Sequence, residues 1–327
     1  MLWEGGVCSG SVSAKHKSRA VRVTRGGMAI ALLIGFGAAV LLGAESIGKY
    51  FNEGIRLAVE RVLPSTFPFM VLSSLVSAMI DPTSMPTVSR AFQRVFSVSG
   101  AGLGAFIIGS LAGFPVGAKL TSELYCDGLL SRSDAERLMA YSCSPSAPFA
   151  VAVVGGGMLG DKALGIILLL SVWIGNVLCA QLFRGKCDNI SIRVEKTRQK
   201  PNFVEAVKSA TSSSIYMAAF VSFFYIVSSA AKIGLRNRLI RSAFIMAIEV
   251  SGAMLFISEE IGNLYLTMSF SALALGFGGL SVMAQVYAVT DGSGLRMRKY
   301  FYIKIFSALF SAILAPLITA IYAAIFG

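Results

Sequence analysis

Charged side chains are scarce in this sequence. Of its 327 residues, 14% are charged and 55% are hydrophobic, whereas soluble proteins carry about 25% charged residues. The mean hydropathy is +0.71. This balance excludes an ordinary soluble protein and indicates a membrane protein.

The side chains and motifs of common catalytic sites are also missing. The one histidine, His16, lies near the N-terminus, so the rest of the chain has no histidine for acid–base chemistry or for an HExxH zinc site. There is no GxxxxGK[ST] loop for ATP hydrolysis and no GxSxG element. We therefore expect no enzymatic activity, no cofactor and no metal site.

Apolar runs of about 17–25 residues recur along the chain, which is long enough to cross a hydrocarbon core of ~30 Å. They lack the period-2 alternation of an outer-membrane barrel. The sequence therefore predicts an all-α, polytopic membrane protein with about eight apolar segments. The net charge of +12 lies mainly in the loops between them, which indicates membrane topology and not nucleic-acid binding.

The predicted organisation is a tail followed by two membrane repeats. Residues 1–26 are basic: they are either a cytoplasmic tail that orients the first helix, or an untranslated stretch if synthesis begins at Met28. The first repeat is predicted over 27–160 and the second over 161–327. The basic linker 184–202 is expected in the cytoplasm.

Two stretches suggest an internal duplication. "GFPVGAKLTSELYCDGLLSR" (113–132) and "GFGGLSVMAQVYAVTDGSGLR" (276–296) both begin with Gly-Phe and both contain Asp-Gly after a tyrosine. The placement of the basic tail and linker favours opposite orientations of the repeats, which is an inverted topology. The loops that follow the two stretches are then expected on opposite sides of the membrane.

Both stretches contain residues that interrupt a helix. These are Gly113, Pro115 and Gly117 in the first stretch and Gly278 in the second. Proline removes a backbone N–H, and an unpaired backbone group in hydrocarbon costs several kcal/mol. Such breaks persist only inside protein or beside water, and transporters use them near the midplane to contact solutes. We therefore predict broken or re-entrant helices at a solute site.

Four polar residues near these breaks are candidate solute or ion ligands. Lys119 and Glu123 lie one helical turn apart, so they either line a hydrated cavity or hold segments together as an ion pair. Ser281 and Gln285 in the second stretch either contact the solute or bond to a neighbouring helix.

Two further sites are candidates. Glu249 is a lone acid in an apolar run, which marks either an ion or proton site or a bond to adjacent backbone. The segment "CSPSAP" (143–148), with Ser144 and Ser146, is either an unwound solute-contact loop or a plain turn between helices.

The motifs "GFPVGAKLTSELY" and "GLLSRSDAERLMAY", around 111–140, together with "EVSGAM" (249–254) and "LGFGGLSVMAQVY" (275–287), resemble the sporulation integral membrane protein family that carries a nucleoside-recognition (Gate) domain. The resemblance extends over about residues 28–327. It implies a multi-pass protein of the inner (cytoplasmic) membrane of endospore-forming bacteria, with a fold related to concentrative nucleoside transporters and ferrous-iron transporters. Where the family tends to have an Asn-Asn pair, this chain has Cys143 to Ser146. If that pair contacts the solute, the resemblance does not identify the solute of this chain.

Two functions follow from these features. The paired breaks favour a transporter-like protein that moves a small polar solute, nucleoside-like or other, during spore envelope or cortex formation. The lack of a dense polar set for ion coupling favours a non-transporting membrane scaffold. The expected partners are the lipid bilayer, a small polar solute and further copies of the chain, but no nucleic acid.

Overall fold

The computed structural model describes residues 44–77, 85–185, 187, 202–234 and 237–326, and their regular structure is entirely helical. The predicted all-α class is therefore confirmed for these ranges. Predictions for the tail 1–26, for nearly all of the apolar segment 27–44 and for most of the linker 184–202 concern residues outside them.

The elements are α2 Ala44–Arg56, η1 Leu57–Val62, α3 Leu63–Ser77, α4 Pro86–Phe96, η2 Gly100–Gly102, α5 Leu103–Ala112, α6 Val116–Cys126, α7 Arg132–Tyr141, η3 Phe149–Met158, α8 Lys162–Leu182, α9 Phe203–Gly234, α10 Arg238–Ile248, α11 Val250–Glu260, α12 Leu264–Phe277, α13 Gly279–Thr290 and α14 Met297–Phe326.

Several of these helices are long and apolar enough to cross a membrane. Within the described ranges there are four, or five if α4 and α5, which are bent by 101° at η2, form one broken span. The chain is thus an α-helical membrane protein. The figure of about eight apolar segments stays a prediction, because one of them lies mostly outside the described ranges and others are shorter helices. The four spans are Lys162–Leu182, Phe203–Ser229, Leu264–Thr290 and Met297–Phe326.

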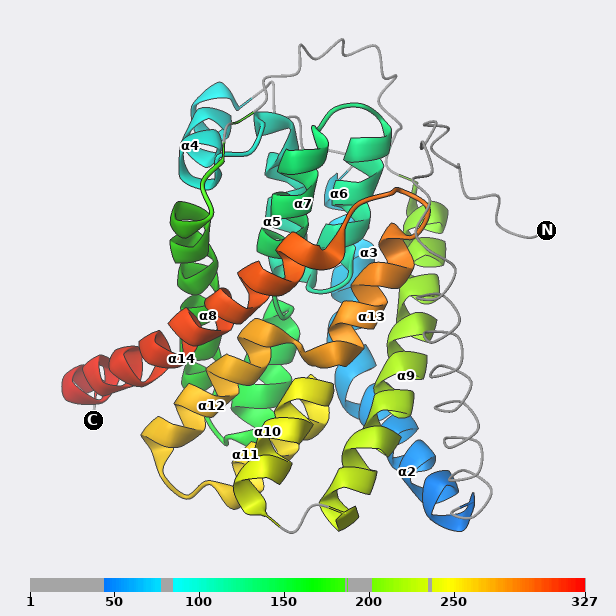
Figure 1. Cartoon of the computed structure of the whole chain (residues 1–327), viewed down its shortest axis with the longest axis vertical. Helices are drawn as coiled ribbons and strands as arrows, with labels where there is room; N and C mark the ends of the chain where they lie inside the picture. The colour runs from blue at the N-terminus through cyan, green and yellow to red at the C-terminus, as the bar shows by residue number, and fades with distance from the viewer. Residues whose placement is uncertain (1–43, 78–84, 186, 188–201, 235–236, 327) are drawn as a thin grey trace, which may run out of the picture.

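In the first half, α5 and α6 form a hairpin that does not cross the molecule. The chain reverses at Gly113–Pro115, and α6 packs back along α5 (Figure 1). The outer ends of both helices lie at the upper end of the molecule in Figure 1, and the tip lies near its middle. Next, α7 descends from the upper end, the chain leaves helical structure over 142–146, and η3 continues downward before α8 returns.

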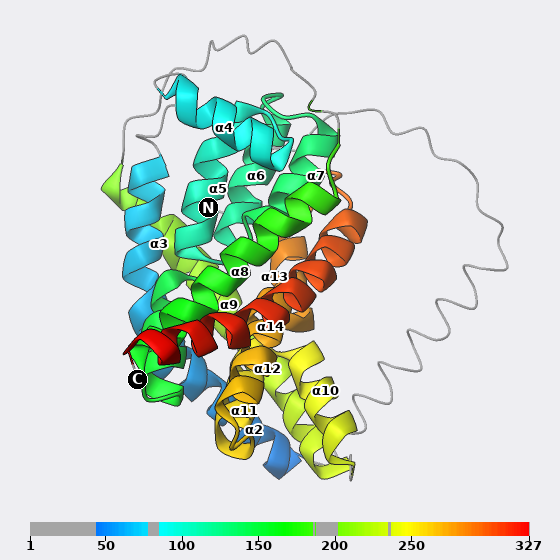
Figure 2. The ribbon, with the colours of Figure 1, turned by 90° about the vertical axis from the view of Figure 1, so that its left-hand side faces the viewer.

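The second half also contains a hairpin and a pair of helices separated by a break. Helix α9 descends to the lower end, where α10 and α11 form a second hairpin that reverses at Glu249 (Figures 1 and 2). Helices α12 and α13 then rise through the molecule and are separated at Gly278. Helix α14 descends again and crosses the molecule obliquely in Figure 1.

The loops before α7 and α14 lie together at the upper end. Arg132 donates to the carbonyl of Gly294, and Glu136 accepts from the amide of Arg296 at 3.3 Å and from Lys299 Nζ at 3.2 Å. The expectation that these loops lie on opposite sides is therefore wrong. The reason is that 113–126 turns back as a hairpin, whereas the chain after Gly278 continues across the molecule.

This topology predicts which loops share a side of the membrane. In a variant without native cysteines, new cysteines at Asp127 and Asp291 are expected to react with an impermeant thiol reagent from one side. New cysteines at Lys162 and Leu264 are expected to react from the other side. All four positions are exposed. Labelling of Asp127→Cys and Asp291→Cys from opposite sides would contradict the fold.

Candidate functional site

The tip of the first hairpin binds the unwound stretch that follows α7. The amide of Phe114 donates to the carbonyl of Ser144 at 3.0 Å. Gly113 has φ +85°, and a Cβ atom there would lie 2.6 Å from the amide nitrogen of Ser146. Only glycine has both the backbone freedom and the small size for this contact. The two interrupted segments therefore satisfy each other's backbone groups, as hydrocarbon surroundings require.

The same hairpin approaches this stretch along its flanks. A Cβ atom on Gly109 or on Gly117 would lie 2.4 Å from the carbonyl oxygen of Ser142. These glycines, with Gly113, recur every fourth residue, and small residues allow helices in membranes to pack closely. The spacing in the sequence thus reflects close backbone packing at the hairpin tip.

The second hairpin makes an equivalent contact with the break between α12 and α13. Gly278 and Gly279 have φ values of +80° and +77°, and a Cβ atom on Gly279 would lie 2.9 Å from the carbonyl oxygen of Ile248. The helix breaks that the sequence predicted at Gly113–Gly117 and at Gly278 are both present. In each half, the hairpin tip packs on the break in the next helical segment.

Glu249 forms the turn of the second hairpin and is fully buried. Its two carboxylate oxygens accept hydrogen bonds from the amides of Ser251 at 2.9 Å and Gly252 at 2.5 Å. The carboxylate therefore caps the N-terminus of α11, where the helix dipole favours negative charge. This arrangement matches the adjacent-backbone alternative for Glu249, and it also holds the carboxylate at the wall of a cavity.

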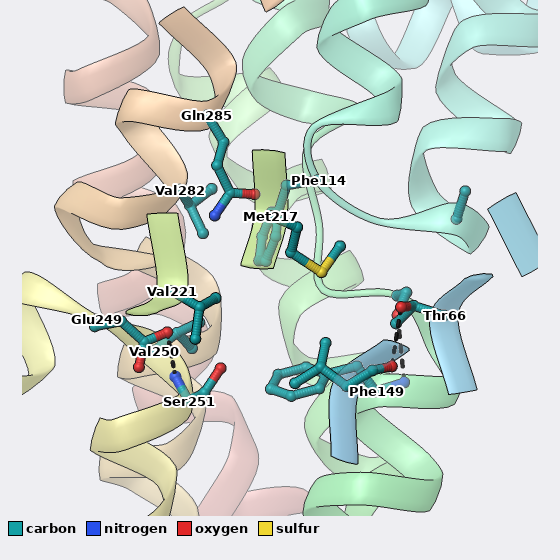
Figure 3. A pocket seen from close by; sticks show the side chains of 13 residues that line it. Thr66, Phe114, Phe149, Met217, Val221, Glu249, Val250, Ser251, Val282 and Gln285 are labelled. Atoms are coloured by element: carbon teal, nitrogen blue, oxygen red, sulfur yellow. Dashed lines mark hydrogen bonds between the residues drawn. The ribbon is translucent and has the colours of Figure 1, made fainter. Parts of the chain in front are cut away.

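A small cavity of about 40 Å³ lies where these elements meet. This is below the usual range of about 300–1,000 Å³ for small-molecule sites, so the surrounding elements must move apart to admit a solute. Phe114 and Phe149 supply aromatic rings to its wall, and Glu249 faces it from the second hairpin (Figure 3). Its other polar lining residues are Thr66, Ser146, Ser251 and Gln285.

The structure brings some of the predicted site residues to this cavity. Ser146, Glu249 and Gln285 line it, and the amide of Gln285 donates to Ser281 Oγ at 3.4 Å. Ser144 lies behind the wall, where its side chain accepts from Asn176 at 2.9 Å. Gly113, Pro115, Gly117 and Gly278 shape the hairpin tips and breaks around it.

Lys119 and Glu123 lie elsewhere. Lys119 donates to Ser209 Oγ of α9 at 2.8 Å, and Glu123 is exposed. Neither residue is part of the cavity wall formed by the described residues. This placement corresponds to the alternative in which Lys119 holds two segments together.

Sequence reasoning missed several lining residues, namely Thr66, Phe149, Met217 and Ser251. Thr66 and Met217 come from α3 and α9, far from the breaks in sequence, and no local pattern distinguishes them from other residues of apolar helices. Ser251 belongs to the "EVSGAM" motif and lies two residues after Glu249. Its nearness to this candidate residue could have identified it as part of the site.

A buried ion pair fixes α7 above the site. Arg137 donates to Asp134 Oδ1 and to the carbonyl of Ser97, both at 2.7 Å, and the amide of Ser99 donates to Asp134 Oδ2 at 2.9 Å. Burial raises the pKa of the neighbouring Cys187 thiol, so this thiol stays protonated at neutral pH. In the part of the chain that the structure describes, no cluster of three or more His, Cys, Asp or Glu residues could hold a metal ion.

Comparison with known proteins gives one informative match. The chain is similar to the sporulation integral membrane protein YlbJ of Bacillus subtilis. The two are 25% identical over 315 aligned residues, which cover 82% of this chain and 76% of YlbJ. No protein-family profile and no solved structure matches the chain. The similarity to YlbJ spans most of both proteins and agrees with the resemblance to sporulation integral membrane proteins, whereas no family profile confirms a Gate domain.

The close contact at the first hairpin tip predicts the effect of Gly113→Ala. Gly113 has φ +85° and ψ −176°, a conformation that essentially only glycine adopts and that costs another residue about 1–3 kcal/mol. The added Cβ atom would also overlap the backbone of Ser146. Gly128→Ala is the matched control, because Gly128 has φ +73° with nothing within 4 Å. In detergent, the midpoint temperature of thermal unfolding should fall clearly further for Gly113→Ala than for Gly128→Ala. Equal losses would mean that the tip does not pack as described.

Proposed function

We propose that this protein is a non-enzymatic membrane transporter that carries a small polar solute through the cavity between the hairpin tips. The observation that carries the proposal is the cavity itself, walled by both hairpin tips and by the unwound stretch after α7. Irregular backbone at membrane depth is tolerated where it is buried in protein or lines a cavity. Carriers place such interrupted helices at their solute sites.

The chemistry of the cavity supports a polar solute with a ring or another flat apolar part. Glu249 offers a buried carboxylate, and Gln285 offers an amide that can both donate and accept. Ser146 and Thr66 add hydroxyl groups, and Phe114 supplies an aromatic surface. Such a mixture of apolar walls and a few polar groups is typical of small-molecule sites.

The order of the elements supports an inverted repeat. The segments that correspond to each other differ from the two stretches, 113–132 and 276–296, that the sequence match paired. The series of hairpin α5–α6, interrupted pair α7–η3 and continuous helix α8 corresponds to hairpin α10–α11, interrupted pair α12–α13 and continuous helix α14. The two series enter from opposite ends of the molecule (Figure 1). We place the boundary between the repeats in the linker 184–202 and not at 160–161, and we relate the fold to the Gate domain.

The similarity to YlbJ supports a role in sporulation. We propose that the protein works as a multi-pass protein of the inner membrane of an endospore-forming bacterium, where it supplies a solute during spore envelope or cortex formation. A non-transporting scaffold for envelope assembly is the competing function, since the similarity to YlbJ supports it equally.

Solute binding is expected to depend on Glu249. Small polar solutes, with nucleosides first, would be tested for thermal stabilisation of the purified protein, where a ligand at 100 times its Kd stabilises by about 2.7 kcal/mol. Glu249→Gln keeps the shape of the side chain and removes its charge. It should weaken binding at least about tenfold, equivalent to ~1.4 kcal/mol. Uptake into proteoliposomes would then be measured for the same solute.

Glu123→Gln is the matched control, because it makes the same chemical change at an exposed position outside the cavity. It should bind and transport as the unmodified protein does. If no solute binds or is taken up, and Glu249→Gln still restores sporulation in a host that lacks its own copy of the gene, the scaffold function is favoured and the transport proposal fails.

A further inference from the structure

Lys304 is a buried cation in the second half that contacts the first half of the chain. It lies on α14 with no exposed surface, and its Nζ donates to the carbonyl oxygen of Cys143 at 2.7 Å. No carboxylate among the described residues forms an ion pair with it. A charged side chain inside a membrane protein is costly, so its retention calls for a specific role.

The position of Lys304 excludes the usual explanation for lysine in a membrane helix. Lysines near helix ends extend toward the headgroups and keep their charge in water. Lys304 instead lies two turns into α14, on the buried face that also carries Tyr300, Ser307 and Ser311. This spacing puts all four on one side of the helix, and its ammonium group therefore points into the protein.

The group that Lys304 contacts is the C-terminal end of an interrupted helix. Helix α7 ends at Tyr141, and the Cys143 carbonyl lies two residues beyond its end. This end carries the negative pole of the helix dipole, which favours a cation. In carriers with interrupted helices, the carbonyls of unwound stretches and helix C-terminal ends coordinate sodium or protons.

Neutral polar groups complete the surroundings of the unwound stretch. Asn176 on α8 donates to Ser144 Oγ at 2.9 Å and accepts from Ser307 Oγ at 2.6 Å. The carbonyl of Ser144 is occupied by the amide of Phe114 at 3.0 Å. Oxygen atoms of carbonyl, amide and hydroxyl groups are the ligands that hard cations prefer. The stretch thus carries oxygen atoms of the type that bind hard cations. Each acceptor oxygen named here has a protein donor, and the donor on the Cys143 carbonyl is the Lys304 ammonium.

We propose that the Lys304 ammonium is a built-in cation that takes the place of a bound metal cation at the interrupted end of α7. It neutralises the C-terminal end of α7. It also links α14 in the second half of the chain to the unwound stretch after α7 in the first half. The fold therefore needs no sodium at this position. The inference rests on the proposed function only in its consequence that solute uptake requires no sodium gradient.

Thermal unfolding in detergent tests this proposal without any solute, so its result does not depend on whether transport is found. The unmodified protein should unfold at the same temperature in sodium chloride and in N-methyl-D-glucamine chloride of equal ionic strength. Lys304→Ser removes the charge, opens space and adds a hydroxyl ligand. Its midpoint should fall by about 4 °C or more, and sodium or potassium should restore it in a saturable way.

Two matched variants separate a cation site from general destabilisation. Lys304→Met fills the same space without charge, so it should be destabilised with no response to any cation. Lys299→Met removes another lysine of α14, one that is partly exposed, and should show no cation response. Saturable stabilisation of the unmodified protein by sodium would overturn the proposal, as would a Lys304→Ser variant that responds to no monovalent cation. The first of these outcomes requires no variant to fold.

Discussion

The fold depends on one constraint: backbone groups released by a helix break must find partners where water is absent. Each half places a hairpin tip on the break in the next helical segment. In the first half, the Phe114 amide donates to the Ser144 carbonyl. In the second half, Gly279 packs closely on the Ile248 carbonyl. The cavity lies between these two contacts, so the elements that make the fold possible also form the wall of the site.

Two lysines connect the halves of the chain near the site, among many contacts between their helices. Lys304 connects α14 to the unwound stretch after α7, and Lys119 connects the first hairpin to α9. Both lysines bond to uncharged oxygens, which are weaker partners than carboxylates. At the upper end, Lys299 of α14 also pairs with the buried carboxylate of Glu136 at 3.2 Å. A rearrangement of one half relative to the other therefore breaks hydrogen bonds of charged donors near the site and separates this ion pair at the upper end.

The sequence predicted the features that have local chemical causes. Apolar length predicted membrane-spanning helices, of which α8 is one, and glycine and proline predicted the breaks at Gly113–Gly117 and Gly278. Whether a broken segment turns back or continues depends on what it packs against, and local sequence did not distinguish these two cases at 113–117 and at Gly278. Lys304 carries the same signal as Glu249, a single charge in an apolar run, and could have been singled out on that ground.

Helix α14 is longer than a bilayer core is thick. Its 30 residues extend about 45 Å at 1.5 Å per residue, whereas the hydrocarbon core is ~30 Å thick. Its oblique path in Figure 1 accommodates the extra length, and the tilt of such a helix is set by the helices that it packs against. Because the same helix carries Lys304, its packing on α8 and α12 also fixes the direction from which the ammonium reaches the Cys143 carbonyl.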